Sequence, residues 1–449
     1  MSARTLIRDV RLSTSARDAS HTVRNSLLGV VFGFGGGVLS AHLLGPHDRG
    51  TLALLVTTVG ITGFLASLGS NVALRVGLLR DPRIQLRPYV ELSLLLSGVQ
   101  AVLVVAAVVL LGSLIDLDQH RRLGLVAAAV GLGLTYFASQ QVLDSLNAIG
   151  WPSGSAMLNS VGTLVTCLLL LVAWWLRQGL YAAVGAYAGG FVVVVVLGVL
   201  LHRTHAAAVP VPDPQLASRS VFVRRGLPML GLNLSQALAF RLDRYFVGAS
   251  AGAAATGMYA VAAAHVAPSQ VASNSIGQVA SRDAARDDLP DRRLAAMALA
   301  ATLLAAAAAV VLWLLSPWFV PTVFGREFAA SVPLVRVLML GQVVLAPYLV
   351  LCRAFTGRGL GLVSSASGVL LLVLLTVALA VLTPGYGALG AAWATVLAFG
   401  LSSLALALLT RFPVARPRPP AMSAHPSREL TPPRSWSTTG PDQSPRKDP

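Results

Sequence analysis

The sequence predicts an all-α integral membrane protein with about twelve transmembrane helices, on three observations. Hydrophobic residues make up 55% of the 449 positions and charged residues only 12%. The mean hydropathy is +0.71, and a soluble domain carries about twice this charged fraction. Apolar windows of about 20 residues, long enough to cross a bilayer, follow one another along almost the whole chain. The turns between them leave no room for a folded aqueous domain.

Twelve apolar runs, separated by short turns with Gly, Pro or Arg, define the predicted spans. The first run starts too late and is too long for a cleaved signal peptide, and a second run follows it after a few residues. We therefore expect the N-terminal segment to stay attached. The predicted spans cover residues 26–44, 51–74, 89–115, 123–147, 154–176, 181–201, 225–248, 254–280, 294–316, 331–356, 360–382 and 386–410.

The distribution of arginine predicts the orientation, because Lys and Arg in short loops favour the cytoplasmic side. Arginine is concentrated in 1–24, 75–87, 203–225 and 282–293, and these segments alternate with turns that hold few arginines. A cytoplasmic N-terminus satisfies the rule, and an even number of spans returns the C-terminus to the cytoplasm. The turns predicted to lie outside hold only Arg49, Arg121, Arg122, Arg177 and Arg326.

The net charge of +16 is explained by this topology and requires no nucleic-acid partner. Nucleic-acid binding would need a folded module that presents a basic surface, and no such module fits between the spans. The tail 412–449 is rich in Pro, Ser and Arg, cannot bury a core, and is expected to be disordered. Cys167 and Cys352 fall inside predicted spans, which is typical of small apolar core residues and not of a disulfide or metal pair.

An internal repeat is the most informative pattern in the chain. The turn in "LLGPHDRGTLAL" matches the turn in "ASAGAAATGMYAV". An offset of 207 residues, the difference between 257 and 50, aligns Gly50 with Gly257 and also Gly45 with Gly252. The two halves therefore share one plan of six helices.

Six is an even number, so both halves enter the membrane in the same orientation and form parallel repeats. The predicted parts are a basic cytoplasmic segment 1–24, a first six-helix bundle 25–203, a cytoplasmic linker 204–224, a second bundle 225–411 and the tail from 412. Two such bundles leave a central cleft between them. Rocking of the halves about this cleft would open it to one side of the membrane at a time.

Two segments carry a resemblance to a known family. One is a helix that ends in "LLGP", a tight turn and a second helix that ends near "SLGSN"; the other is "RLDRYFVGASAGAAATGMYAVA". They resemble polysaccharide flippases of the multidrug, oligosaccharidyl-lipid and polysaccharide (MOP) exporter superfamily, and the likeness covers roughly residues 20 to 410. It implies two parallel six-helix bundles around a central cleft, as in MATE transporters of that superfamily.

The resemblance also implies a function. The expected substrate is a polyprenyl-pyrophosphate-linked oligosaccharide, which such flippases move from the inner to the outer leaflet. The expected location is the cytoplasmic membrane of a bacterium, and the expected partners are the bilayer and polysaccharide assembly proteins. An ion gradient, the membrane potential or substrate flux would drive the transport.

Other functions remain open. A cation-coupled drug exporter of the superfamily is expected to have more acidic residues in its first bundle, where Asp144 is the only deep one. A flippase of the same superfamily for the peptidoglycan precursor is a further alternative. A polytopic polymerase or glycosyltransferase usually has a sizeable outer loop, and every outer turn here is short. The only lysine is Lys447, which excludes a P-loop, and HExxH and CxxC are absent from the sequence, so we expect no enzymatic activity, cofactor or metal.

The candidate substrate-binding residues begin with the charged stretch of the seventh predicted span. On a continuous helix, Asn233, Gln236, Arg241, Asp243 and Arg244 fall within one arc of about 160°. In one interpretation the arginines snorkel to the outer headgroups and Asp243 pairs with a neighbouring helix. In the other they line the cleft and bind the diphosphate, since a guanidinium forms two parallel hydrogen bonds with phosphate.

The eighth predicted span adds further polar candidates. Pro268 is expected to kink the helix, and Gln270 and Asn274 follow on a face that should meet water or substrate. His265 lies close to the predicted midplane. It is a candidate proton relay, but a hydrogen-bonded packing role is favoured for a lone histidine.

Three more charges are candidates at the cytoplasmic mouth of the cleft. Arg24 and Arg75 lie near span ends, where snorkelling is the usual role, but they would also attract a diphosphate before it enters. Asp144 belongs to a polar stripe at the inner end of the span 123–147. This stripe lines the mouth or packs against the next helix.

Overall fold

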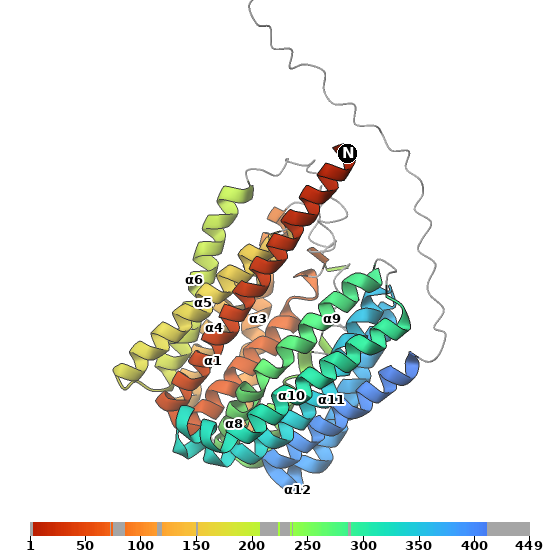
Figure 1. The fold of residues 1–449 in the computed structure, drawn as a ribbon. Helices are drawn as coiled ribbons and strands as arrows, with labels where there is room; N and C mark the ends of the chain where they lie inside the picture. The colour runs from red at the N-terminus through yellow and green to blue at the C-terminus, as the bar shows by residue number, and fades with distance from the viewer. Residues whose placement is uncertain are drawn as a thin grey trace, which may run out of the picture. The chain divides into compact units, whose positions relative to one another are not determined.

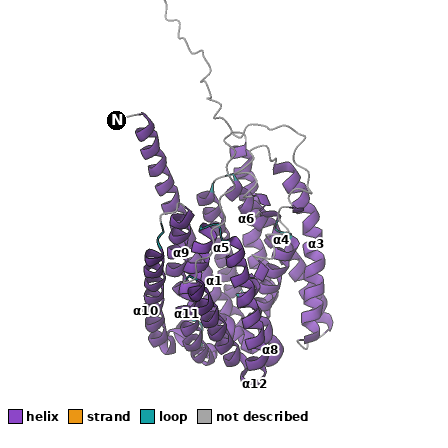
Figure 2. Ribbon diagram, turned by 90° about the vertical axis from the view of Figure 1, so that its right-hand side faces the viewer, coloured by secondary structure: helices purple, strands orange, loops and turns teal. Residues whose placement is uncertain are grey.

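The computed structural model describes residues 3–71, 73–74, 86–114, 119–149, 151–206, 223–224, 234–235, 237–285 and 289–410. All of them belong to one compact unit, Met1–Val414. The regular elements in these ranges are helices joined by short loops, with no strand among them (Figure 2). Asn233, Gln236 and Arg75 lie outside the described residues.

The helices of the two halves follow the predicted order. The first half contains α1 (Ala3–Ala66), α3 (Leu86–Leu114), α4 (Gln119–Ala148), α5 (Pro152–Trp175) and α6 (Leu180–Ala206). The second half contains α8 (Leu242–Val266), η1 (Ala267–Ser269), α9 (Gln270–Ala285), α10 (Asp291–Val323), η2 (Arg326–Ser331), α11 (Val332–Gly357) and α12 (Gly361–Leu409).

Within the described residues, nine apolar segments are long enough to cross a membrane. Three of them are much longer than one crossing needs: Arg24–Ala66 with 43 residues, and Ala237–Ala285 and Gly361–Leu409 with 49 each. Each of these three contains all or part of two predicted spans. The structure is thus consistent with the twelve spans that the sequence predicts.

Single glycines divide the long helices. Gly45 interrupts α1 with φ 64° and ψ 179°, and Gly252 interrupts α8 with φ 80° and ψ 179°. Glycine adopts this left-handed φ at little cost, and the matching angles confirm the alignment of the two halves. The predicted turn at 45–50 is shorter than expected, because the helix resumes at Pro46, whose fixed φ suits the first helical position.

The glycine breaks lie at one end of the helices, which we call the kink end. Gly387 divides α12 there, and a Cβ on it would lie 3.8 Å from the Cβ of Ala251, next to Gly252. The arginine distribution predicts that the kink end faces the outside.

Two predicted spans are broken where continuous helices were expected. The span 51–74 leaves helical geometry after Ala66, in a turn where Leu68 and Gly69 have positive φ. The span 225–248 contains a turn at Phe240 and Arg241, and α8 begins only at Leu242. The single polar arc expected along this span assumed an unbroken helix, and the structure has a turn between its two ends.

Prolines explain the other irregular features. The 3-10 turn Ala267–Ser269 separates α8 from α9 at Pro268, so the predicted kink is confirmed. The helix α10 runs on to Val323, beyond the predicted end at residue 316, although it contains Pro317 and Pro321. Prolines are tolerated inside membrane helices because neighbouring groups satisfy the freed carbonyls.

The helix α1 runs between the two halves. It packs against α5 of the first half and against α8 of the second (Figure 1). In the second half, α11 contacts α9, α10 and α12. The most apolar window of α11 is 67% buried inside the protein, whereas that of α10 is only 17% buried, so α11 forms the centre of this half and α10 its lipid-facing side.

Candidate functional site

The two halves meet where residues 46–66 of α1 cross α8, and we call this contact the seam. A Cβ on Gly50 would lie 1.8 Å from the carbonyl oxygen of Ala253. A Cβ on Gly257 would lie 1.9 Å from the carbonyl oxygen of Pro46. Only glycine permits this approach, so the helices touch backbone to backbone.

Two hydrogen bonds cross the seam beyond the glycine contact. The guanidinium of Arg244 donates from Nη1 to Thr57 Oγ1 at 2.9 Å. The hydroxyls of Tyr245 and Thr58 lie 2.7 Å apart. Adjacent residues of α8 thus bind adjacent residues of α1.

Arg241 reaches the first half from the start of α8. Its Nη1 lies 2.0 Å from where a Cβ of Gly60 would be, and its guanidinium carbon lies 5.9 Å from the centroid of the Phe64 ring. The Tyr136 hydroxyl on α4 lies close enough to this guanidinium for the positive charge to act on the phenol. Gly60 therefore makes the space that the Arg241 side chain occupies.

Asp243 lies in the first turn of α8, where a helix N-terminus favours negative charge. Its Oδ2 accepts a hydrogen bond from the Tyr259 hydroxyl at 2.8 Å, and its Oδ1 accepts one from the backbone N–H of Arg244 at 2.9 Å. The fully buried Tyr259 ring fixes this carboxylate. This carboxylate thus lies beside Arg244, the next residue along α8.

The cluster lies deep along the helices. Thr57 is roughly 16 Å from Pro46 along α1, at 1.5 Å per residue. The hydrocarbon core of a bilayer is about 30 Å thick. The bond from Arg244 to Thr57 therefore lies near the middle of a span that starts at the kink end.

His265 lies inside the second half and does not face the seam. The side chain is 2% exposed, and its ring centroid lies 5.0 Å from that of Phe319 on α10. The Nε2 atom of this ring is buried without a hydrogen-bond partner in the described part of the chain. The packing role and the proton relay both stay predictions for His265.

Gln270 and Asn274 are half-buried on α9. Arg353 of α11 donates a hydrogen bond from Nη2 to Asn274 Oδ1 at 3.2 Å. Asn274 therefore has a partner within the second half, apart from the seam.

The candidates of the predicted cytoplasmic mouth differ from one another. Arg24 is exposed on α1. Asp144 is 5% exposed on α4 and lies close enough to Tyr136 for its charge to act on that phenol. Tyr136 thus links Asp144 to Arg241, whereas Arg24 stands apart from this group.

Several seam residues were not among the candidates from the sequence. Thr57, Tyr136 and Tyr259 bind the predicted charges, but a hydroxyl in an apolar run gives no signal of its partner. The adjacent pair Thr57 and Thr58 was the available hint, because two polar residues in succession are unusual within a span. Arg49, assigned to an outside turn, is only 8% exposed.

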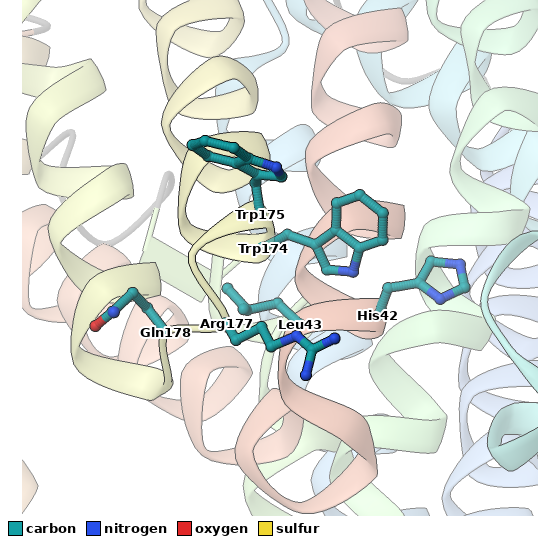
Figure 3. Close-up of a pocket in the computed structure, with 6 residues that line it drawn as sticks. All are labelled: His42, Leu43, Trp174, Trp175, Arg177 and Gln178. Atoms are coloured by element: carbon teal, nitrogen blue, oxygen red, sulfur yellow. The ribbon is translucent and has the colours of Figure 1, made fainter.

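A separate pocket of about 550 Å³ lies at the kink end. Figure 3 shows the Arg177 side chain extending toward Leu43 beneath Trp174, while Gln178 points away. Trp175 is 78% exposed, as is common for aromatic side chains at membrane interfaces. The pocket contains none of the predicted site residues; it is lined by His42, Leu43, Trp174, Trp175, Arg177 and Gln178.

Comparison with known families identifies the chain. A family model described as polysaccharide biosynthesis protein matches residues 16–282, which is more than half of the sequence. The chain belongs to the polysaccharide biosynthesis protein family. The match includes both sides of the seam, from Arg49 and Thr57 to Arg244 and Tyr259. Among curated protein sequences, none is matched by this chain.

Solved structures of the MOP superfamily share the fold. An inward-facing MATE family multidrug transporter superposes with a TM-score of 0.67 at 16% identity, over 85% of this chain and 94% of the other. The Lipid II flippase MurJ, in an inward closed conformation, gives 0.70 at 12% identity over 88% of both chains. A MOP superfamily transporter from Pyrococcus furiosus gives 0.59 at 16% identity, over 88% and 94%. This polysaccharide biosynthesis family member is a multi-pass membrane protein with the MOP fold, as the resemblance implied.

Proposed function

We propose that the protein moves a polyprenyl-pyrophosphate-linked oligosaccharide across the cytoplasmic membrane by alternating access. The family and the MOP fold support a transporter of lipid-linked sugars. The observation that carries the proposal is that Arg241 and Arg244 extend from the second half toward α1 of the first half, deep within the spans. A diphosphate that crosses the bilayer requires cations at this place.

The depth of the arginines favours the cleft over the headgroups. A snorkelling arginine extends its guanidinium toward the membrane surface. Arg244 instead extends toward Thr57, and Arg241 lies against Gly60 and beside Tyr136. An arginine at this depth is stabilised by protein or water partners and not by lipid.

The site chemistry suits reversible diphosphate binding. Guanidinium stays charged at any working pH and binds two phosphate oxygens in parallel. The Arg244 bond to a neutral hydroxyl is weak enough for a phosphate to replace it, because bonds between charged partners are roughly twice as strong. Asp243, held by Tyr259, lies beside Arg244 and would compete with the diphosphate for that guanidinium.

A lipid-linked peptidoglycan precursor is the second candidate substrate. The TM-score of 0.70 with the Lipid II flippase MurJ supports it, and both substrate classes carry a diphosphate. The arginines would bind the diphosphate of either substrate. The residues of the cleft that bind the sugar would therefore determine which substrate is transported.

The test is transport by reconstituted vesicles, with substrate that reaches the outer leaflet measured by an impermeant sugar-modifying enzyme. Arg241→Ala and Arg244→Ala should each reduce the rate at least tenfold, which corresponds to about 1.4 kcal/mol. Arg→Lys changes should restore it only partly, since Lys lacks the fork of two parallel donors. Arg326→Gln, at an exposed position, is the matched control. Normal transport by both Ala variants would contradict diphosphate binding by the arginines and would support the interpretation in which they snorkel to the headgroups.

A further inference from the structure

The pocket at the kink end has no role in the proposed transport. It has a volume of about 550 Å³ and is bordered by α1 and by the turn that follows α5. Figure 3 shows the Arg177 side chain reaching into this space beneath the indole of Trp174. Within the described part of the chain, Arg177 forms no ion pair, and no acidic residue lines the pocket. Its positive charge is therefore available to a ligand.

The backbone at Arg177 is strained, because its φ is 51°. The helix α5 ends here in a Schellman motif, in which the Gln178 N–H donates to the Ala173 carbonyl at 2.9 Å. The residue with positive φ in this motif is usually glycine. The same motif ends α11, and there Gly359 has the positive φ, 78°. Arginine has a steric cost at this position that glycine does not have, which indicates a role for its side chain.

Arg177 lies at the level of the lipid headgroups. The helix α5 has 24 residues, or about 36 Å at 1.5 Å per residue, and the hydrocarbon core is about 30 Å thick. The turn after α5 is therefore outside the hydrocarbon core. Trp174 and Trp175 are 48% and 78% exposed, and tryptophan is enriched at this interface. Phospholipids surround the protein at this level, and each of them carries a phosphate.

We propose that the kink-end pocket binds the phosphodiester of an anionic phospholipid, with Arg177 as the cation and Trp174 as an apolar wall. A guanidinium offers two parallel N–H donors to phosphate oxygens. No carboxylate lines the pocket among the described residues, so none is available to pair with the ammonium of a zwitterionic lipid. Phosphatidylglycerol, which has one net negative charge, matches the charge of Arg177. The site lies within the first half, apart from the seam, and does not depend on the proposed substrate.

The wall formed by His42 connects the pocket to the second half. His42 Nε2 lies 2.8 Å from the carbonyl oxygen of Val323 and donates a hydrogen bond to it. Val323 is the last residue of α10. The bond fixes the His42 ring as a wall of the pocket only while α1 and α10 are in contact. We therefore expect a lipid in the pocket to favour the state in which the kink end is closed, because binding and conformation are linked.

Native mass spectrometry of the purified full-length protein, with lipid added to the detergent, tests the binding. The first phosphatidylglycerol should bind roughly tenfold more tightly than phosphatidylcholine, and Arg177→Gln should abolish this difference. Arg326→Gln removes an exposed arginine at the same end and is the matched control, which should keep the difference. Equal affinities of the two lipids for the unchanged protein, or an unchanged difference in Arg177→Gln, would overturn the proposal.

A second set of measurements tests the source of the phosphate. Phosphatidylglycerol should raise the midpoint of thermal unfolding, and inorganic phosphate should leave it unchanged. Trp174→Leu should weaken phosphatidylglycerol binding severalfold, whereas Trp318→Leu, at a position 65% exposed on α10, should not. Stabilisation by inorganic phosphate as large as that by phosphatidylglycerol would show a site for a free anion and would refute the lipid.

Arg177→Gly separates lipid binding from a structural role. Glycine adopts a φ of 51° without steric cost, so without added lipid the unfolding midpoint of this variant should equal or exceed that of the unchanged protein. Phosphatidylglycerol should raise the midpoint of the unchanged protein and not that of Arg177→Gly. A lower midpoint for Arg177→Gly without lipid would show that the arginine stabilises the fold itself, which contradicts the binding role.

Cross-linking tests the link to closure. With Cys167 and Cys352 replaced by Ala, the pair Thr58→Cys and Tyr245→Cys is treated with a short bifunctional thiol reagent. Phosphatidylglycerol should speed the bridging, and the effect should vanish when Arg177→Gln is added. A rate that phosphatidylglycerol leaves unchanged would refute the coupling. None of these measurements requires transport, so their outcome is independent of the proposed function.

Discussion

Gly50 and Gly257, equivalent positions of the two repeats, pack directly against each other. The carbonyl that approaches Gly50 is that of Ala253, and the carbonyl that approaches Gly257 is that of Pro46. Each carbonyl belongs to the residue four positions before the partner glycine. The contact is therefore symmetric with respect to the two halves. The repeat in the sequence therefore becomes a pseudo-twofold contact at the kink end.

The first prediction is that this contact is required for closing the seam. Gly50→Leu or Gly257→Leu places a side chain where backbone atoms now lie. Overpacking of this kind costs about 1–3 kcal/mol, which shifts a two-state equilibrium roughly 5- to 150-fold. Transport in reconstituted vesicles should fall by a factor within this range, and bridging of Thr58→Cys with Tyr245→Cys should slow.

Gly98→Leu is the control for these variants. A Cβ on Gly98 meets no atom within 4 Å, and its helix α3 carries exposed apolar neighbours. This variant should insert, transport and bridge like the unchanged protein. Equal losses in Gly98→Leu would mean that leucine harms membrane insertion in general, and the seam argument would fail.

The parts of the fold that depend on patterns within the chain were predictable. The lengths of the apolar runs predicted where the spans lie. The 207-residue offset paired Gly45 with Gly252, whose backbone angles agree closely. A glycine before a helix start is a local feature, because the turn needs a residue that tolerates positive φ. Such signals do not depend on which other helix is nearby.

The parts that depend on contacts between distant segments were not predictable. Arg241 was placed on a continuous helix, but the backbone turns there and its side chain lies against Gly60. Arg49 was assigned to an outside turn because it lies between two predicted spans, yet it is only 8% exposed. Both outcomes follow from the packing of α1 on α8. The amino-acid composition of a single span does not predict which other helix packs against it.

The second prediction concerns the hydrogen bond that holds Asp243. Tyr259→Phe keeps the buried ring and removes the donor to Oδ2. A hydrogen bond to a charged group contributes about 1.5–3 kcal/mol, so the midpoint of thermal unfolding should fall. Tyr386→Phe, at a position 70% exposed, should leave it unchanged. Equal midpoints for both variants would show that the Asp243 contact contributes nothing to stability.

The third prediction concerns topology. Reporter fusions at residues 83, 213, 288 and 425 should report a cytoplasmic position, because arginine-rich segments favour that side. Fusions at 47, 119, 178 and 326 should report the outside. Opposite sides for 213 and 288 would contradict six spans in each half and the parallel repeat.

The fourth prediction concerns the polar residues Gln270 and Asn274 of α9. Asn274→Cys and Gln270→Cys, in a protein without Cys167 and Cys352, should react with a membrane-impermeant thiol reagent applied to inside-out vesicles. The reagent requires a thiolate in contact with water, and polar side chains within spans face the bundle interior or a water-filled cavity. Leu303→Cys is the control, since it is 60% exposed on α10 but should face lipid and stay unlabelled.

Substrate protection completes this prediction. A lipid-linked oligosaccharide in the cleft should slow labelling at Asn274→Cys, because it displaces water from that surface, and labelling should recover when the substrate is removed. Cys352→Ser is the preferred background, since Ser364 Oγ lies 2.8 Å from Cys352 Sγ and keeps a partner. Equal labelling of Asn274→Cys and Leu303→Cys would show that water does not distinguish the two faces, and α9 would then have no part in the substrate path.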